Sequence, residues 1–318
     1  MSPISGLKKQ LSQESILIHC DLSENYNLKY AQDTLSFHFG GSRQQINLHT
    51  VVVYKTTADS IVKPKSYCTM SECLKHDVPA IWAHLLPVLK DSYATMVHFL
   101  SDSPATQYRN KCMFNFLVKN LNRHFSQIKM VTWNYCEAGH GKGPPDGIGG
   151  VCKRTADRIV PQGSDIDSLR TLIDVLEKNC SKIKFYIITE QEINKIRQQV
   201  EQNDNLIFKG TMKVHQVVSK FSSKCWFLTL SCFTCEETCH HYGLGCLKYK
   251  DFGSENIPCT SKTSKLRYED VYSDSEEEDG VVMSSKIKPC CHILVEVKID
   301  AKKNVSNEKY KYMPKRDG

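Results

Sequence analysis

Three aspartates stand where buried segments of this 318-residue chain end. Asp21 closes the apolar run SILIHCD, and Asp102 closes the run TMVHFLSD. Asp146 follows a third apolar run, IKMVTWNYC, and the glycine-rich segment after it. Short apolar runs of this kind are typical of central strands in an α/β sheet. Acids at such strand ends meet at the carboxyl edge of the sheet, where open α/β folds present their sites.

The chemistry that such acids support is phosphodiester cleavage with divalent metal ions. Carboxylate oxygens are the ligands that Mg²⁺ prefers. Two ions held about 3.5–4 Å apart activate the attacking oxygen and stabilise the leaving one. The sequence therefore predicts a site for two Mg²⁺ or Mn²⁺ ions at Asp21, Asp102 and Asp146. Each acid alone also fits a turn or a helix cap, and Asp146, before GIGG, is a good cap candidate.

The elements expected around these acids follow from hydrophobic spacing. Two β-rich runs, INLHTVVVY and KSYCTMS, lie between the first two acids. Apolar residues at helical spacing predict helices before and after Asp102, and further helices follow Asp146. The helices are expected at 78–89, 108–125, 151–160, 167–177 and 190–200, with a strand at 184–189. The expected order of the first part is therefore β-β-β-α-β-α-β-α.

The glycine-rich segment GHGKGPPDGIGG is not a nucleotide-triphosphate loop. It lacks both the G-x-x-x-x-G-K-[ST] spacing and a G-x-G-x-x-G directly after a strand. His140 and Lys142 within it are candidates for contacting a phosphate or moving a proton. The alternative is a surface loop with an incidental His and Lys.

Three blocks of the chain resemble a known group of proteins. They are DLSENYNLKYAQDTLSFHFGGSRQQINLHTVVVY, FLSDSPATQYRNKCMFNFL and WNYCEAGHGKGPPDGIGGVCKRTADR, and HGKGPPDGIGG is the most specific part. They resemble transposon-derived proteins of animal genomes, which are DDE-type, RNase H-like transposase relatives. The resemblance covers roughly residues 16–245. It implies an RNase H-like mixed sheet flanked by helices.

The resemblance also implies roles for individual residues. Asp21, Asp102 and Asp146 fall at the acidic positions, while Glu137 and Asp157 compete with Asp146 for the third. A serine follows Asp102 where the family pattern has a glycine. The residues in the adjoining motifs are Glu24, Asn25, Gln107, Asn110 and His140.

A second cluster, CFTCEETCHHYGLGC, is rich in cysteine and histidine. A C-x₂-C pair can direct two thiolates at one ion, and Zn²⁺ needs two further sulfur or nitrogen ligands. Clustered cysteines in a chain without a signal peptide suggest metal more than disulfides, and the alternative is a metal-free cysteine-rich turn. A structural zinc is predicted, with His241, His215 and Cys225 as alternative ligands. The predicted zinc ligands are Cys232, Cys235, Cys239, His240 and Cys246.

Composition and charge divide the chain into five parts. The expected parts are a leader at 1–14, the RNase H-like domain at 15–204, a Cys/His-rich module at 205–254, an acidic disordered linker at 255–290 and a short strand with a basic tail at 291–318. The last part is expected to begin a module that this chain does not complete. The net charge of +7, despite the acidic run, fits a polyanionic partner such as DNA. No apolar run approaches the roughly 20 residues of a membrane span.

The leading hypothesis is a transposase-like polynucleotidyl transferase or nuclease that acts on DNA. If the substrate is DNA, the protein is expected in the nucleus, and otherwise in the cytoplasm. A separate DNA-targeting domain or partner is expected to be needed. A homo-oligomer is compatible with the sequence. The alternative is a catalytically inactive, transposon-derived protein that binds nucleic acid or protein. A small-molecule metal hydrolase is disfavoured, because the histidines are dispersed.

Overall fold

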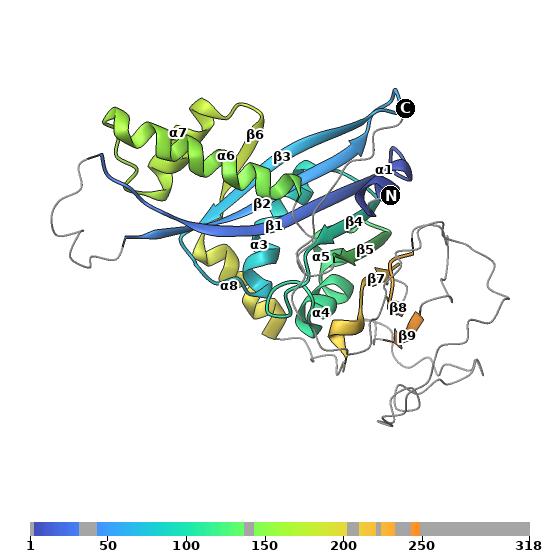
Figure 1. Cartoon of the computed structure of the whole chain (residues 1–318). Coiled ribbons are helices and arrows are strands. Elements are labelled where there is room, and N and C mark those ends of the chain that lie inside the picture. Colours follow the sequence, from blue (N-terminus) through green and yellow to red (C-terminus); the bar gives the residue numbers. More distant parts are fainter. Residues whose placement is uncertain are drawn as a thin grey trace, which may run out of the picture.

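A nine-stranded mixed sheet organises the computed structural model (Figure 1). The structure describes residues 3–31, 43–136, 143–201, 210–220, 224–232 and 243–248. The strands are β1 (Ser15–Asn27), β2 (Gln45–Thr56), β3 (Val62–Ser71), β4 (Met96–Ser101), β5 (Met130–Tyr135), β6 (Ile183–Ile187), β7 (Gln216–Ser219), β8 (Lys224–Leu228) and β9 (Gly243–Lys248). Their order across the sheet is β6-β3-β2-β1-β4-β5-β7-β8-β9.

The strands differ in direction across this sheet. β1, β2 and β3 are antiparallel neighbours, whereas β4 and β5 run parallel to β1. β6 lies parallel to β3 at one edge, and β7, β8 and β9 continue the other side in antiparallel pairs. The expected succession of three strands, helix, strand, helix, strand, helix is observed from β1 to α6, except that the one helix expected at 108–125 is divided into two, α4 and α5.

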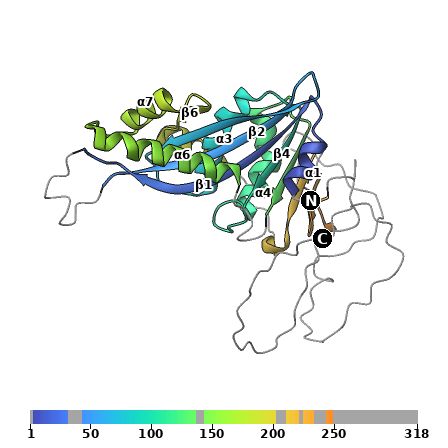
Figure 2. The ribbon, with the colours of Figure 1, turned by 45° about the horizontal axis from the view of Figure 1, so that its top comes forward.

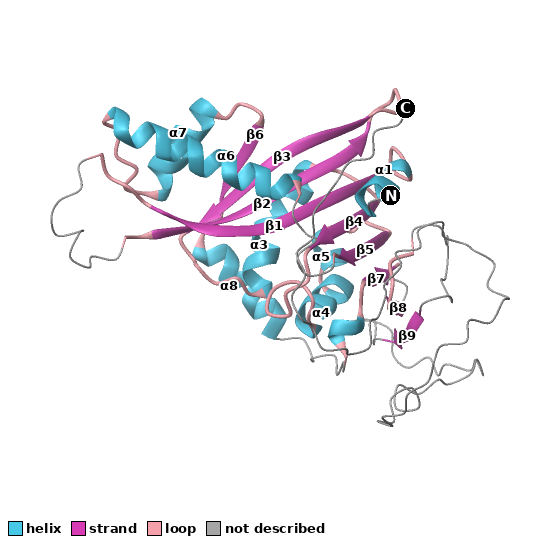
Figure 3. Ribbon diagram, in the orientation of Figure 1, coloured by secondary structure: helices cyan, strands magenta, loops and turns pink. Residues whose placement is uncertain are grey.

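Helices cover both faces of the sheet, as Figure 3 shows. The α-helices are α1 (Pro3–Lys9), α3 (Val78–Asp91), α4 (Lys111–Lys119), α5 (Leu121–His124), α6 (Pro144–Ile159), α7 (Leu169–Asn179) and α8 (Glu190–Glu201), and the 3₁₀ helices are η1 (Val160–Gln162) and η2 (Thr211–Lys213). Among these described helices, none is both long and apolar enough to cross a membrane.

Two hydrophobic cores result, one on each face. Alternation along β1 separates them, because Ile16 and Ile18 enter one core while Leu17 enters the other. The larger core packs α3, α4 and α8 against the sheet, and Trp82 of α3 lies at its centre, stacked on Phe116. The second core lies under α1, α6 and α7. We call the side covered by α6 the α6 face and the opposite side the α3 face.

Two elements are longer than the sequence predicted. β1 does not end at Asp21 but continues to Asn27, pairing with β2 as far as Gln45 with one irregularity. α6 begins at Pro144, inside the segment expected as a glycine-rich loop. Prolines suit the first turn of a helix because they have no N–H to leave unpaired, so the PP pair starts this helix despite the glycines that follow.

The expected boundary at 204/205 lies between α8 and β7. Beyond it, β7 pairs with β5, so these strands extend the sheet of the first part. The linker at 255–290 and the terminal segment at 291–318 lie outside the described residues, and the five-part division stays a prediction.

Candidate metal and nucleic-acid site

Asp21 lies in β1 and Asp102 directly after the neighbouring parallel strand β4, at the same level of the sheet. The pairing of β1 with β4 ends at His19 opposite Leu100, and each aspartate comes two residues later. Neighbouring strands are about 4.8 Å apart, so the two residues are brought side by side. Asp21 shares the α6 face with Leu17 because side chains two and four residues apart in a strand point the same way.

Asp146 reaches this place from α6. The helix packs closely on β1, because a Cβ added at Gly143 would come within 2.6 Å of His19, and one at Gly149 within 2.7 Å of the Ser23 hydroxyl. Asp21 lies midway between these two strand residues, and Asp146 lies midway between the two glycines. The first turn of α6 therefore carries Asp146 over Asp21. A side chain at either position would displace His19 or Ser23, so glycine permits this close approach.

The charges of the three aspartates act on one another. Burial, then the charges of Asp102 and Asp146, raise the pKa of Asp21 to about 7. Burial, then the charge of Asp146, raise the pKa of Asp102 to about 6. Among the described residues, the ion pairs include none of these three carboxylates. A neighbouring carboxylate without a cation between raises the pKa of Asp21 and of Asp102 in this way.

One carboxylate oxygen of this group is left without a partner. Oδ1 of Asp102 is buried and accepts no hydrogen bond from the part of the chain that the structure describes. A buried, unsatisfied polar atom costs roughly 1–3 kcal/mol, and such atoms in native proteins call for an explanation. A hard cation would satisfy it, so the donor set fits Mg²⁺ or Mn²⁺.

The group is not closed around a single point. Oδ2 of Asp146 accepts a hydrogen bond from the backbone N–H of Gly143 at 2.7 Å, which makes Asp146 the capping residue of α6. Within the described ranges, no three His, Cys, Asp or Glu side chains are arranged to hold one ion. The three charges are thus neighbours, and Asp146 keeps its Oδ1 outside this hydrogen bond.

Of the two competitors for the third acid, one is described. Asp157 accepts hydrogen bonds from Tyr26 at 3.1 Å and from Lys29 at 2.6 Å. It stands eleven residues beyond Asp146, about 16 Å further along α6 at 1.5 Å per residue. Its partners and its place give Asp157 a structural role. Glu137 lies outside the described residues.

The loop after Asp102 is held firmly. The Trp133 indole donates to Ser101 Oγ at 2.9 Å, and the Ser101 hydroxyl donates to the backbone carbonyl of Asp102 at 2.8 Å. Asn110 caps α4 by accepting from the N–H of Met113 at 2.9 Å. Its amide nitrogen also donates to the carbonyl of Gln107 at 3.0 Å. Asn110 and Gln107 therefore shape this loop, and a constrained loop gives Asp102 a fixed position.

A pair on the α3 face supports the same loop from below. The hydroxyl of Tyr108 and Nε2 of His49 are 2.9 Å apart, and both side chains are fully buried. His84 of α3 meets the His49 ring edge-on with ring centres 5.7 Å apart. Burial, then the positive charges of His84 and His76, lower the pKa of His49 well below its usual range, so His49 is neutral. No spacing along the chain indicates this pair, because it lies on the face opposite the acids.

The other residues of the adjoining motifs lie apart from the three aspartates or outside the described residues. Glu24 is exposed on β1 beyond the acids. Asn25 contacts Gln45 and His76 at 3.3 Å each. His140 and Lys142 lie outside the described residues.

His19 belongs to the site although it was not predicted. It lies two residues before Asp21 on the same face of β1, and its ring faces Gly143 at the start of α6. Strand alternation alone could have indicated it.

The predicted zinc cluster is described only at its edges. The backbone of Cys232 is bound to the Gln216 side chain, with Cys232 N–H donating to Oε1 at 2.9 Å. Cys246 lies in β9 opposite Trp226. Cys235, Cys239 and His240 are outside the described residues, as is the alternative ligand His241.

The two other alternative ligands are described. Cys225 is buried in the larger core. Nε2 of His215 lies 3.3 Å from Nη1 of Arg109. The zinc site stays a prediction.

Comparison with known proteins gives a family without a described activity. A family model described as "Domain of unknown function (DUF8701)" matches residues 2–231. The match includes all three aspartates and stops before Cys235. No curated protein and no solved structure matches the chain significantly.

Proposed function

We propose that this chain, which belongs to the DUF8701 family, is an RNase H-like, transposase-type enzyme that cleaves and transfers phosphodiesters in DNA. The observation that carries the proposal is the gathering of Asp21, Asp102 and Asp146 from two adjacent parallel strands and the following helix. Three charges in electrostatic contact, without a paired cation among the described residues, form a site suited to divalent ions.

The strand order supports the RNase H-like part of the proposal. The central five strands have the order β3-β2-β1-β4-β5, in which the first three are antiparallel and β4 and β5 run parallel to β1. The acids lie in β1, just after β4, and in the helix after β5. A mixed sheet flanked by helices with acids at these places is compatible with the RNase H-like fold that the resemblance implies.

The roles of the residues follow from their places. Asp21 and Asp102 would hold the divalent ions, and Asp146 would complete the set through the carboxylate oxygen that does not cap α6. Bound ions would supply an activated attacking oxygen and a stabilised leaving oxygen. The hydrogen bonds through Ser101 and Trp133 would hold the Asp102 loop in place.

The alternative is a binding protein of the same fold that has lost catalysis. One observation favours it: Asp146 caps α6 and leaves the described acids without a closed three-ligand group. In that case the acids repel one another without a compensating ion, and the DNA would be bound but not cut.

A nicking assay separates the two. Purified protein is incubated with supercoiled plasmid in Mn²⁺ or in EDTA. Metal-dependent nicking is expected, and Asp21→Asn and Asp102→Asn should each reduce it by at least roughly 100-fold, since even residues behind a metal ligand cost 10–100-fold. Asp157→Asn, which removes the Lys29 pair, is the matched control. Nicking that survives Asp21→Asn would overturn the proposal.

A further inference from the structure

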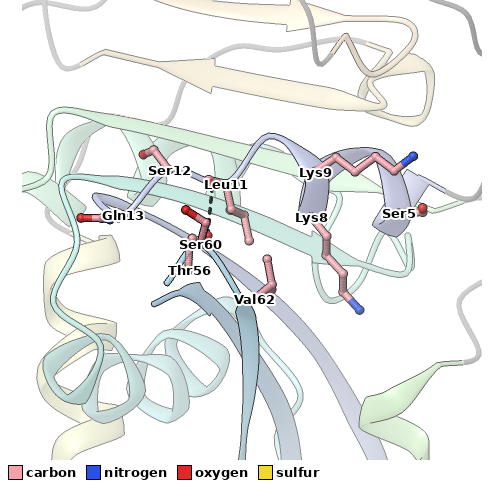
Figure 4. Close-up of a pocket in the computed structure, with 9 residues that line it drawn as sticks. All are labelled: Ser5, Lys8, Lys9, Leu11, Ser12, Gln13, Thr56, Ser60 and Val62. Carbon is pink, nitrogen blue, oxygen red and sulfur yellow. Dashed lines mark hydrogen bonds between the residues drawn. The ribbon is translucent and has the colours of Figure 1, made fainter. Parts of the chain in front are cut away.

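A polar hollow lies at the start of β1, on the α6 face (Figure 4). Its volume is about 690 Å³. It lies between α1, the segment that leads into β1, and the turn that joins β2 to β3. The residues that line it are Ser5, Lys8, Lys9, Leu11, Ser12, Gln13, Thr56, Ser60 and Val62.

The lining of this hollow is suited to an anion. Both charged residues among the nine are lysines, and no carboxylate is among them. Three serines, a threonine and a glutamine add hydrogen-bonding groups. Thr56 donates its hydroxyl to the carbonyl of Leu11 at 2.9 Å, which ties the β2 end to the segment before β1. Such a lining offers hydroxyl donors and two positive charges to phosphate oxygens.

Lys8 is built into the structure of this hollow. Its ammonium lies 3.7 Å from the centre of the Tyr54 ring, and burial lowers the pKa of Lys8 below its usual value. The neighbouring Leu7 and Leu11 are buried in the core of the α6 face, which holds α1 in place. The position of Lys8 is therefore set by an aromatic contact and by packing on both sides.

Ser60 adds a second feature. It is the one non-glycine residue with a positive φ, 57°, among the described residues. The turn at this place usually takes glycine, because a side chain is disfavoured at positive φ. The backbone conformation at this position favours glycine, so the serine is not explained by the turn itself. Its hydroxyl lies in the lining of the hollow.

The hollow and the three aspartates are aligned along one face of β1. Tyr54, under Lys8, pairs with Leu17 of β1. Asp21 is four residues further along β1 than Leu17, about 13 Å at 3.3 Å per residue. His19 lies between them on the same face of β1. α1 and α6 lie on this same face of the sheet, as Figure 2 shows.

We infer that this hollow binds the phosphodiester backbone of a nucleic-acid strand and directs the strand along β1 toward the three aspartates. The choice of a nucleic-acid ligand rests on the proposed function. The hollow adds a contact region in the segment that the sequence suggested was only a leader. In this inference Lys8 binds a phosphate oxygen, and Ser60 donates a hydrogen bond to the same backbone.

The test is binding of fluorescein-labelled dT20 in EDTA, followed by fluorescence anisotropy at several salt concentrations. The background is the Asp21→Asn, Asp102→Asn variant, so no cleavage enters the measurement. We expect Lys8→Ala to weaken binding at least about fivefold and to reduce the slope of log K against log salt by about 0.7–1. Ser60→Gly, which suits the positive φ, should weaken binding about twofold to threefold without loss of folding.

The matched control is Lys90→Ala. This lysine is exposed on α3, on the opposite face, and its loss changes the net charge equally. If Lys8→Ala and Lys90→Ala have the same affinity and salt slope, or if the background variant does not bind dT20, the inference is wrong.

The binding and nicking assays also separate this inference from the proposed function. If Lys8 is needed for binding but the nicking assay is blank, the hollow stands and the cleavage proposal falls. If the protein nicks plasmid while Lys8→Ala binds dT20 as tightly as the background variant does, the cleavage proposal stands and the hollow is not a strand-binding site.

Discussion

The pKa of Asp91 and the pKa of Asp21 are shifted in opposite directions. Asp91, at the end of α3, accepts from Lys65 at 2.6 Å, from Lys184 at 2.7 Å and from Tyr67 at 2.7 Å. Burial would raise the pKa of Asp91, but these three donors outweigh it and hold the pKa well below its ordinary value. At Asp21 burial acts in the same direction, and neighbouring carboxylates add to it, so the pKa rises to about 7.

The two pKa shifts reflect different surroundings of Asp91 and Asp21. Asp91 has cations from the chain itself, so it joins α3 to β3 and β6 and completes a structural contact. Asp21 and Asp102 have neighbours of their own sign and a buried oxygen without a partner among the described residues. Under the proposed function, the group lacks positive charge until a divalent ion binds, which would be an exchange of stability for function.

The largest expected effect is the pH dependence of metal binding. A carboxyl with a pKa of about 7 must lose its proton before it binds a metal. The affinity for Mn²⁺ should therefore rise with pH, by roughly 100-fold between pH 5 and pH 8 at about tenfold per unit below the pKa. Calorimetry at four pH values measures it. An affinity that is flat over this range would contradict the assignment of Asp21.

The next effect distinguishes the third acid. Asp146→Asn should weaken Mn²⁺ binding roughly 10-fold or more, because it removes a charge from the set. Asp157→Asn should leave the affinity unchanged, since Asp157 is paired with Lys29. Both are measured by the same titration. If Asp157→Asn weakens binding and Asp146→Asn does not, the third ligand has been assigned wrongly.

A smaller effect is expected at Tyr108. Tyr108→Phe removes the hydroxyl bonded to His49 but keeps the ring in the core. We expect Mn²⁺ affinity to fall severalfold, up to about tenfold as for other residues behind metal ligands. The loss of one buried hydrogen bond costs about 1 kcal/mol of stability. Equal Mn²⁺ affinity in Tyr108→Phe and the parent would limit the pair to a packing role.

The smallest effect is on thermal stability. Its sign is expected to differ between a substitution of Asp21 and a substitution of Asp91. Because the folded protein holds the Asp21 proton more tightly than the unfolded chain does, stability of the metal-free protein should fall as pH rises from about 4 to 7. Asp21→Asn should raise Tm at pH 8 by about 2–4 °C, while Asp91→Asn should lower it by a similar amount. Thermal melts in EDTA check both. A lower Tm in Asp21→Asn would remove the contrast between the two groups.

Much of this arrangement could be predicted from the sequence, and particular residues show where prediction ends. Asp21 and Asp102 were found because each follows a buried apolar run, and the parallel register then places them side by side. The start of α6 was missed because glycines weaken a helix prediction, whereas Pro144 and the carboxylate of Asp146 begin it. The capping role of Asp146 was foreseen as an alternative.

Other features depend on contacts that no local pattern encodes. The His49–Tyr108 pair joins β2 to the loop after β4, and its two residues are 59 positions apart. Lys8 belongs to a segment that was expected to be a leader, and only its packing over Tyr54 gives it a place. Such long-range contacts arise from the fold and cannot be inferred from spacing along the chain.

The most direct test of the central claim is a Mn²⁺ titration at pH 8, in which free Mn²⁺ is measured by electron paramagnetic resonance. We predict saturable binding in the parent chain that is lost in Asp21→Asn and in Asp102→Asn and retained in Asp91→Asn. If the parent binds no Mn²⁺, or if Asp21→Asn binds it as well as the parent does, the three aspartates are not a metal site.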